Sequence, residues 1–357
     1  MSENTRKIVI MAACIVCLTM ALISSILMPK ADYKHKSILK NLKNENNIAQ
    51  NIAQSEEIDA QNIPTIVEPL KKQNRGAVVI EQSSRRVLYS HGMNERCYPA
   101  STTKVLTALC VLNNLPLEKI VTMPKEAEGV EGSSIYLKAG EKISVKDLLL
   151  GLMLRSGNDA AVTLAIATSG SVEQFANLMN KTAEECGAIN SHFVNPHGLN
   201  DGMHYTTAYD LALICAKAYE NADFVKIVST KKAKITVDGE DRYIGNKNKL
   251  LNVYDGANGV KTGYTKKSGR CLVSAAKRDG MQVIGVVLNH SDMWNDSVRM
   301  LDFAFDNYYM CPLDNALLTS GESVVKVQIK QNVTQDWRNV CYPLKKDGSE
   351  RLVISTI

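Results

Sequence analysis

The pattern of apolar and polar residues changes several times along the chain, and its first stretch is long and apolar. Residues 8–28 carry no charge and directly follow Arg6 and Lys7. About 20 apolar residues suffice for a helix to cross a bilayer, and basic residues before it keep the N-terminus in the cytoplasm. No clean Ala-x-Ala cleavage site follows. Residues 1–28 are therefore predicted to be an uncleaved membrane anchor, with a cleaved signal as the alternative, and the rest of the chain is expected outside the cytoplasm.

The second stretch, residues 29–72, is polar and has no sustained hydrophobic period. It is rich in Lys, Asn, Gln and Glu and contains few large apolar residues. Such a composition buries too little apolar surface to fold by itself. We expect a flexible linker, with a root-mean-square reach of roughly 35 Å.

Short alternating runs begin at Gly76 and occur in two places. Residues 76–81 and 86–89 flank the turn residues 82–85, and this pattern predicts a β-hairpin. The pattern recurs far downstream, where residues 271–276 and 281–288 flank a turn at 278–280. Two β-hairpins are therefore predicted, separated by almost 200 residues.

Between the hairpins the hydrophobic period becomes helical. Ser144 precedes an apolar run and is expected to cap a helix. Ser171 has Gln174 three residues later, as in a capping box, and Gly187 is expected to close that helix. The long segment between the hairpins is thus predicted to be a helical insert.

The C-terminal part adds a helix near residues 294–309 and an alternating run at 324–329. Together, the patterns predict an α/β fold in which one antiparallel sheet is covered by helices, with a large helical insert and a short C-terminal β tail. The chain is divided into an anchor or signal (1–28), a linker (29–72), one folded domain (73–310) and a β-rich tail (311–357).

The amino-acid composition argues against nucleic-acid binding. Hydrophobic residues make up 45% and charged residues 22% of the chain, as in soluble globular proteins. An aromatic content of 6% argues against a stacking platform for single-stranded nucleic acid, and a net charge of +5 is only a mild excess. We therefore expect no nucleic-acid partner.

Cysteines and histidines do not follow the spacing of a metal site. Cys14 and Cys17 lie in the apolar run, and the seven other cysteines are irregularly spaced, so buried thiols are expected instead of a disulfide framework. Three histidines between residues 192 and 204, near Asp201, raise the alternative of a zinc peptidase. Their spacing matches no common ligand pattern, and neither a metal nor a cofactor is predicted.

Candidate chemistry begins at Ser101. Ser101-Thr102-Thr103-Lys104 opens a helical run, which places Lys104 one turn after Ser101 on the same face, within reach of the hydroxyl. The Ser-x-x-Lys spacing alone is weak evidence, because it occurs four more times in the chain. On a purely structural interpretation, Ser101 caps the helix and Lys104 is solvated.

Two further motifs accompany this one. Ser156-Gly157-Asn158 lies between two apolar runs, where a short turn presents both polar side chains to a cleft. Lys261-Thr262-Gly263 is expected on a strand edge beside the second hairpin. Each motif is weak evidence when taken alone.

In this order, the motifs resemble those of the low-molecular-mass D-alanyl-D-alanine carboxypeptidases, penicillin-binding proteins of serine peptidase family S11. The resemblance rests on five blocks: PASTTK at 99–104, LKAGE at 137–141, SGNDAA at 156–161, HFVNPHGL at 192–199 and GVKTGYT at 259–265. It covers about residues 76–309 and is specific, because several ordered blocks agree.

The resemblance implies a serine β-lactamase/DD-peptidase-like domain and a serine-type D-Ala-D-Ala carboxypeptidase of peptidoglycan biosynthesis. Ser101 is expected to attack the carbonyl between the two D-alanines of a stem peptide and to form an acyl-enzyme that water hydrolyses. Lys104 acts as the base only when neutral, and burial together with the charge of Lys261 is expected to lower its pKa. β-Lactam antibiotics are expected to acylate the same serine.

The resemblance also implies roles for the other motif residues. Ser156 relays a proton to the leaving amine, and Asn158 holds Lys104 and the substrate amide. The backbone N–H groups of Ser101 and Tyr264 form the oxyanion hole. Lys261 and Thr262 bind the terminal carboxylate. The implied substrate-binding residues are Lys261, Thr262, Gly263 and Tyr264.

The chain also departs from the family pattern. Many relatives have an arginine just after the last sheet strand that helps to hold the substrate carboxylate, whereas residues 289–292 contain none. The tail is shorter than the second domain of well-known relatives and lacks an amphipathic helix at its C-terminus. Membrane attachment is therefore expected through the N-terminal segment.

Two other functions are considered. A class A-like β-lactamase needs a glutamate that activates the deacylating water, in a Glu-x-x-Leu-Asn context. No such segment lies between Asn158 and Lys261, so slow deacylation of penicillin is expected. A non-catalytic cell-wall-binding module is the third hypothesis, and the presence of a nucleophile, a base and a proton relay argues against it.

Overall fold

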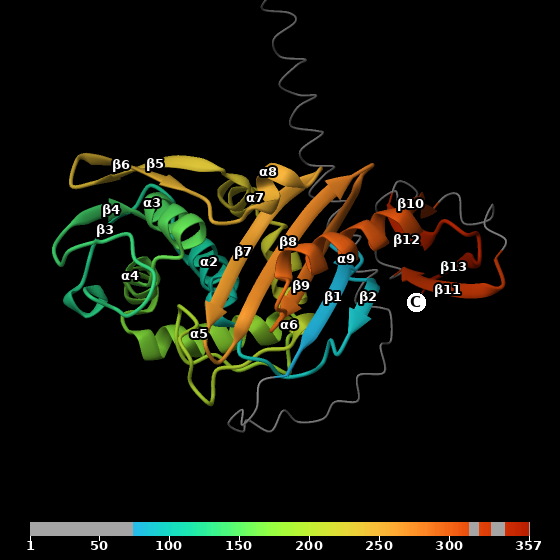
Figure 1. Ribbon diagram of the computed structural model, residues 1–357, viewed down its shortest axis with the longest axis horizontal. Coiled ribbons are helices and arrows are strands. Elements are labelled where there is room, and N and C mark those ends of the chain that lie inside the picture. The colour runs from blue at the N-terminus through green and yellow to red at the C-terminus, as the bar shows by residue number, and fades with distance from the viewer. Residues whose placement is uncertain (1–73, 314–320, 330–339, 357) are drawn as a thin grey trace, which may run out of the picture.

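The computed structural model describes residues 74–313, 321–329 and 340–356 (Figure 1). The predicted anchor at 1–28 and the predicted linker at 29–72 lie outside these residues. No helix among the described residues is long and apolar enough to cross a membrane.

The elements follow one another in the order of their numbers. The α-helices are α2 (Lys104–Asn114), α3 (Val145–Leu150), α4 (Asn158–Ser169), α5 (Val172–Glu185), α6 (Ala208–Ala218), α7 (Ala222–Ser229), α8 (Leu250–Val253) and α9 (Met293–Asn307). The 3₁₀ turns are η1 (Ala100–Thr103) and η2 (Lys125–Ala127), and η3 (Gly151–Arg155) is a π-helical turn. The strands are β1 (Gly76–Glu81), β2 (Val87–His91), β3 (Ile120–Thr122), β4 (Lys142–Ser144), β5 (Lys232–Val237), β6 (Glu240–Gly245), β7 (Ala257–Thr265), β8 (Gly269–Arg278), β9 (Met281–Leu288), β10 (Tyr308–Pro312), β11 (Ser323–Ile329), β12 (Cys341–Lys345) and β13 (Glu350–Thr356).

The central sheet has five antiparallel strands in the order β2-β1-β9-β8-β7 (Figure 1). Both predicted hairpins are confirmed, as β1–β2 and β8–β9. They form one sheet because β1 pairs with β9 along its whole length, from Gly76 opposite Leu288 to Glu81 opposite Val283. This order leaves β7, which carries the Lys-Thr-Gly motif, at an open edge.

Both faces of the sheet are covered, as the alternation along β1 shows. Val78 and Ile80 belong to the large core that the sheet shares with the helical insert. Ala77 and Val79 point to the opposite face, where α9 packs on β8 and β9. Because both faces are buried, β1 and β9 are almost continuously apolar.

The helical insert follows the expected start and stop signals. The hydroxyl of Ser144 accepts a hydrogen bond from the Asp147 N–H at 3.0 Å, and that of Ser171 accepts one from the Gln174 N–H at 3.1 Å. Gly187 has a φ of +82°, which suits a residue that ends a helix. Helix α2 lies at the centre of the insert and contacts α4, α5 and α6.

The insert also contains a second sheet that the sequence pattern did not predict, in the order β3-β4-β5-β6. Strands β3 and β4 have three residues each, too few to show an alternation. Strand β5 begins in a lysine-rich segment, where Lys232 and Lys234 are exposed. Asp238 and Gly239 form its turn to β6, with φ values of +49° and +83°.

The predicted last helix extends two residues too far. Helix α9 ends at Asn307, because Tyr308 and Tyr309 already pair with Lys345 and Leu344 in the strand pair β10–β12. A helical period cannot reveal this competing partner. The β tail is confirmed, and its second pair, β11–β13, is parallel. Strand β10 crosses the predicted boundary between residues 310 and 311, and the domain limits stay a prediction.

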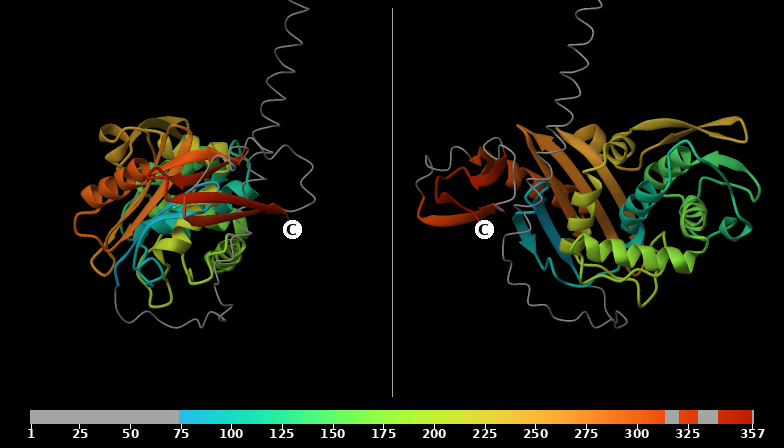
Figure 2. Two further views of the ribbon diagram at one scale, coloured as in Figure 1. Left: turned by 90° about the vertical axis from the view of Figure 1, so that its right-hand side faces the viewer. Right: turned by 180° about the vertical axis from the view of Figure 1, so that it is seen from behind.

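The tail is attached to the first hairpin by a buried ion pair between Arg86 and Glu350. The guanidinium lies 5.4 Å from the ring centroid of Tyr308 and 5.6 Å from that of Tyr342. Glu350 also accepts a hydrogen bond from the Lys345 N–H at 2.9 Å. Loss of either charge would leave the other buried without compensation, so this pair couples the tail to the sheet. Figure 2 shows the strands of the tail, in red, next to the N-terminal strands, in blue.

Four cysteines of the large domain are fully buried: Cys97, Cys110, Cys215 and Cys271. Burial raises the pKa of each thiol, to about 12 for Cys97 and Cys271. These side chains are neutral and act as small apolar groups, as expected.

Candidate active site

Ser101 lies in the 3₁₀ turn η1, and Lys104 is the first residue of α2. The turn brings the Lys104 Nζ to 3.0 Å from the Ser101 Oγ. Lys104 is completely buried, whereas Ser101 is half-buried. The expected pairing of hydroxyl and amine is therefore present.

Two glycines allow other segments to approach this turn. A Cβ on Gly198 would lie 1.8 Å from the Ala100 carbonyl oxygen, and its φ is +86°. A Cβ on Gly263 would lie 3.0 Å from the Ser101 nitrogen. Strand β7 and the loop around residue 198 therefore rest directly on the backbone of the turn η1 that carries Ser101.

His204, which the sequence suggested only as a candidate zinc ligand, supports the same turn. The His204 Nδ1 accepts a hydrogen bond from the Val194 N–H, which assigns the ring proton to Nε2. The Nε2–H then donates to the Thr103 Oγ1 at 2.9 Å, and that hydroxyl donates to the Ala100 carbonyl. Burial lowers the pKa of His204 to about 3, so the ring stays neutral.

The zinc alternative does not fit these contacts. Both nitrogens of His204 are engaged in the bonds just described, and the His197 Nδ1 accepts from the Leu199 N–H at 3.2 Å. Within the described ranges, no group of three or more His, Cys, Asp or Glu side chains is arranged to hold a metal ion. The histidines thus shape the backbone beside the serine.

The Lys104 amine has three partners. Besides Ser101, its Nζ lies 2.7 Å from the Asn158 Oδ1 and 2.9 Å from the His197 carbonyl oxygen. Burial lowers its pKa well below the usual value, the charges of Lys261 and Lys247 lower it further, and Asp159 acts in the opposite sense. A neutral amine fits this site, because its two N–H groups can donate to the two carbonyl oxygens while its lone pair accepts the serine proton.

The Ser156-Gly157-Asn158 motif forms the opposite wall. Ser156 adopts a left-handed conformation (φ +67°) between η3 and α4 and is almost completely buried. Its hydroxyl has no hydrogen-bond partner in the part of the chain that the structure describes. The Asn158 N–H donates to the Ser133 carbonyl at 2.7 Å, and its Nδ2 donates to the Glu131 carbonyl. These bonds therefore fix the side-chain amide of Asn158, whereas the Ser156 hydroxyl remains available for a hydrogen bond.

Asp159 anchors the loop beside this motif. Its carboxylate accepts hydrogen bonds from the Ser134 hydroxyl at 2.6 Å and from the N–H groups of Ile135 and Leu137 at 3.1 Å. The carboxylate is buried and fully occupied by these donors. Asp159 thus has a structural role, and it holds the LKAGE block against the start of α4.

The third motif lies on the edge strand β7. Lys261 is buried, and its Nζ donates to the Thr262 carbonyl at 2.8 Å. Burial, and then the charge of Lys247, lower the pKa of Lys261 to about 7. Tyr264 is 63% exposed. The ring packs under the guanidinium of Arg270, 5.7 Å away.

Of the eight predicted site residues, Ser156 lies two positions before Asn158, and Lys261, Thr262 and Tyr264 flank Gly263 on β7. The structure joins Ser101, Lys104 and Asn158 through the Lys104 amine and packs Gly263 against the Ser101 nitrogen. It adds contributors that sequence reasoning missed, namely the His197 carbonyl, His204 and Lys247. Each of these is a contact between residues more than 50 positions apart. No local spacing could have revealed them, although the HFVNPHGL block marked the segment that supplies the first.

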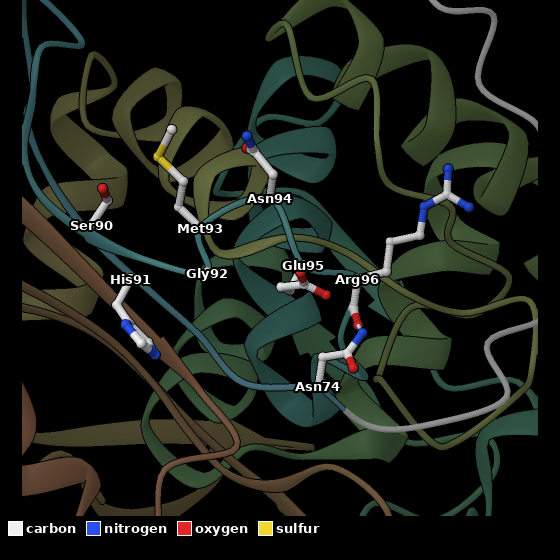
Figure 3. Close-up of a pocket in the computed structure, with 8 residues that line it drawn as sticks. All are labelled: Asn74, Ser90, His91, Gly92, Met93, Asn94, Glu95 and Arg96. Carbon is white, nitrogen blue, oxygen red and sulfur yellow. Dashed lines mark hydrogen bonds between the residues drawn. The ribbon is translucent and has the colours of Figure 1, made fainter.

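A separate cavity of about 540 Å³ lies elsewhere in the domain. It is lined by Asn74 and residues 90–96, none of which belongs to the motifs (Figure 3). The side chains of Met93 and Arg96 diverge from the loop, and Arg96 packs on the Tyr205 ring at 4.8 Å. Because this cavity contains none of the predicted site residues, the Ser101 site is the stronger candidate for chemistry.

Comparison with known proteins agrees with this geometry. The model of the D-alanyl-D-alanine carboxypeptidase family, Peptidase S11, matches residues 63–292. The chain is 36% identical to D-alanyl-D-alanine carboxypeptidase DacF of Bacillus subtilis, over 73% of this chain and 69% of that protein. It is also 36% identical to a D-alanyl-D-alanine carboxypeptidase of Streptomyces sp. K15, over 64% of this chain and 86% of that one. The solved Streptomyces K15 DD-transpeptidase superposes with a TM-score of 0.61 at 34% identity, over 68% of this chain and 98% of that one.

The close approach at Gly198 leads to a prediction. Replacing Gly198 by alanine should destabilise the protein by about 3 kcal/mol or more, because the left-handed conformation and the overlap with Ala100 both carry a cost. Gly239→Ala is the matched control: it has a similar φ of +83° but no atom within 4 Å. It should cost only about 1–2 kcal/mol. Urea unfolding measures both, and equal losses would contradict the steric argument.

Proposed function

The chain belongs to the D-alanyl-D-alanine carboxypeptidase family, peptidase S11, and is a serine-type D-Ala-D-Ala carboxypeptidase. On this premise, we propose that Ser101 is the nucleophile and Lys104 its general base. The observation that carries this proposal is the buried Lys104 amine, 3.0 Å from the Ser101 Oγ and held by two carbonyl oxygens. A base in this position takes the hydroxyl proton as the oxygen attacks.

The acylation step follows from these contacts. The Ser101 Oγ bonds to the carbonyl carbon between the two D-alanines, while its proton moves to the Lys104 Nζ. The oxyanion is stabilised by the backbone N–H groups of Ser101 and Tyr264, which the close contact between Gly263 and the Ser101 nitrogen supports. The C–N bond then breaks, and a proton passes to the departing D-alanine amine.

Ser156 is suited to carry that proton. Its side chain is nearly buried two positions before Asn158, which binds the Lys104 amine, and its hydroxyl is not engaged by another described group. Asn158 holds the Lys104 amine in place through its Oδ1 and presents its amide to the substrate. These contacts support the assignment of Ser156 as relay and of Asn158 as positioning group.

Lys261 and Thr262 are proposed to bind the terminal carboxylate. The Lys261 side chain is buried, and the charge of another cation, Lys247, lowers its pKa in addition to burial. A carboxylate placed there is attracted by both groups and stabilises the charged form of Lys261. The substrate-binding segment 261–264 then lies along the peptide, from its carboxylate to the reacting carbonyl.

Water hydrolyses the acyl-enzyme in the carboxypeptidase reaction. The chain lacks the Glu-x-x-Leu-Asn segment expected of a β-lactamase, so a penicilloyl group on Ser101 should persist. This favours β-lactams as inhibitors over β-lactams as substrates. A similar protein, that of Streptomyces K15, is described as a DD-transpeptidase. Assays should therefore also include an amine acceptor, to test for transpeptidation.

Membrane attachment is also proposed, on the apolar run at 8–28 and the basic residues before it. The full chain should remain in alkaline-washed membranes of an expressing bacterium, and intact mass should show that residues 1–28 are retained. The domain should face away from the cytoplasm, so protease added to spheroplasts should cleave it. An exported protein that lacks these residues and appears in the soluble fraction would instead indicate a cleaved signal.

Mass spectrometry of the full chain tests the proposed chemistry directly. Penicillin should add one penicilloyl group, located on Ser101 by peptide mapping, and diacetyl-lysyl-D-alanyl-D-alanine should release free D-alanine. Ser101→Ala should lose both activities. Lys104→Arg, which keeps the charge but cannot lose its proton, should acylate about 100 to 10,000 times more slowly.

The outcomes separate the alternatives. Rapid turnover of penicillin without D-alanine release would indicate a β-lactamase. If neither the adduct nor the product forms, the remaining interpretation is a non-catalytic module. Thermal unfolding of each variant is the control, because a variant that unfolds early does not report on chemistry.

The lowered pKa values predict a bell-shaped pH dependence of kcat/KM. Activity should fall at low pH as Lys104 becomes protonated, and it should fall again above about pH 7 as Lys261 loses the charge that binds the carboxylate. Lys261→Arg keeps its charge at high pH and should move the alkaline limb upward by at least about one pH unit. Lys277→Arg, an exposed lysine of the neighbouring strand β8, is the control. An alkaline limb that does not move in Lys261→Arg would exclude Lys261 as its origin.

A further inference from the structure

The peptide group that joins Ala100 to Ser101 carries two polar groups of the site, the Ala100 carbonyl and the Ser101 N–H. This peptide is trans, so it is planar and its C=O and N–H bonds point in opposite directions. A contact that fixes the direction of the Ala100 carbonyl therefore also fixes the direction of the Ser101 N–H. That N–H has no hydrogen-bond partner among the residues that the structure describes.

The backbone at Ala100 is not relaxed. Its φ is +50°, in the left-handed region that is unfavourable for a residue with a Cβ. A conformation of this kind persists only where contacts with the surrounding structure hold it in place. The contacts of the Ala100 carbonyl are therefore the ones that decide how the Ser101 N–H is oriented.

Two contacts enclose the Ala100 carbonyl. The Thr103 hydroxyl donates a hydrogen bond to it at 2.9 Å. On another side lies Gly198, where a Cβ would be 1.8 Å from the carbonyl oxygen and 2.8 Å from the Thr103 Oγ1. Ala100 and Thr103 are both completely buried, so loss of the hydroxyl would leave the carbonyl unpaired.

His204 determines how the Thr103 hydroxyl is oriented. The ring accepts the Val194 N–H at Nδ1, at 3.1 Å, and donates its Nε2–H to the Thr103 Oγ1, at 2.9 Å. Because the hydroxyl oxygen accepts from the ring, its own hydrogen is directed to the Ala100 carbonyl. Phe193 holds the ring edge-on, with 5.4 Å between the two centroids. Hydrogen bonds connected in this way strengthen one another.

We propose that His204 and Thr103 are positioning residues for the oxyanion hole, which orient the Ser101 N–H toward the oxygen that becomes negative during acylation. This inference rests on the proposed function, because it needs Ser101 as the nucleophile and its N–H as an oxyanion donor. Both side chains are buried and act through the peptide group between Ala100 and Ser101. A donor oriented in advance stabilises the transition state without reorganisation.

The ester carbonyl of the penicilloyl adduct reports on the oxyanion hole. Benzylpenicillin that is isotope-labelled at its β-lactam carbonyl is allowed to acylate Ser101 of the full chain. The stretch of the labelled ester is then isolated by infrared difference spectroscopy against the unlabelled adduct. Hydrogen bonds from the hole weaken the C=O bond, so a well-oriented Ser101 N–H lowers the wavenumber of this band.

Thr103→Val keeps the shape of the side chain and removes the hydroxyl. We expect its ester band at higher wavenumber and its acylation by benzylpenicillin to be about ten times slower. Thr103→Ser keeps a hydroxyl and should restore most of both. His204→Asn retains an acceptor for the Val194 N–H but loses the donor to Thr103, and it should shift the band in the same direction by a smaller amount.

Thr107→Val is the matched control. Thr107 is a completely buried threonine one turn further along α2, and its hydroxyl donates to the Pro196 carbonyl at 2.7 Å. The substitution removes the same kind of buried hydrogen bond without removing a contact of the Ala100 carbonyl. It should lower the thermal unfolding temperature and leave the wavenumber of the ester band unchanged.

An unchanged ester band in Thr103→Val would overturn the proposal, even if that variant is less stable or acylates slowly. An equal shift in Thr107→Val would overturn it as well, because a general loosening of α2 would then explain both. If Thr103→Val forms no adduct, His204→Asn decides, and an unchanged band there overturns the proposal. Failure of the unsubstituted chain to form the Ser101 adduct would instead refute the proposed function itself.

Discussion

The burial of one primary amine, that of Lys104, is the constraint on which the rest of the site depends. A charged ammonium without solvent costs several kcal/mol, so the group is stable only if the cleft accommodates the neutral form. The cleft does so with two carbonyl oxygens and one hydroxyl, which together use both N–H groups and the lone pair. The same arrangement that makes burial tolerable also leaves the amine lone pair free for the proposed role as a base.

This arrangement needs three distant segments to meet at a fixed separation. Ser101 comes from η1, Asn158 from the start of α4, and the His197 carbonyl from a loop that has no regular structure. Gly198 and Gly263 let two of the neighbouring segments approach the serine turn without a side chain between them. The hydrogen bonds of His204 and Asp159 then lock the flanking loops. The chemistry therefore relies on backbone packing as much as on the motif side chains.

Features that depend on residues close together in the chain could be predicted from the sequence. The hairpins at β1–β2 and β8–β9, the caps at Ser144 and Ser171, and the serine–lysine pair one helical turn apart all depend on residues that are close in the chain. Strands β3 and β4 are too short to show a period, and their pairing depends on distant partners. The bonds from Lys247 to Ser133 and from His204 to Thr103 join residues about 100 positions apart. Such contacts leave no local signature, so they became visible only in three dimensions.

The ion pair between Arg86 and Glu350 has a consequence for how chains of this family can vary. Arg86 belongs to the first hairpin, but its only acidic partner among the described residues is in the last strand, β13. An exchange of residues 311–357 for a different C-terminal module would remove Glu350 and the Tyr342 ring, and it would leave the Arg86 guanidinium beside Tyr308 without a carboxylate. A module that replaces the tail must therefore supply an acidic partner for Arg86, or a smaller uncharged residue must take the place of the arginine.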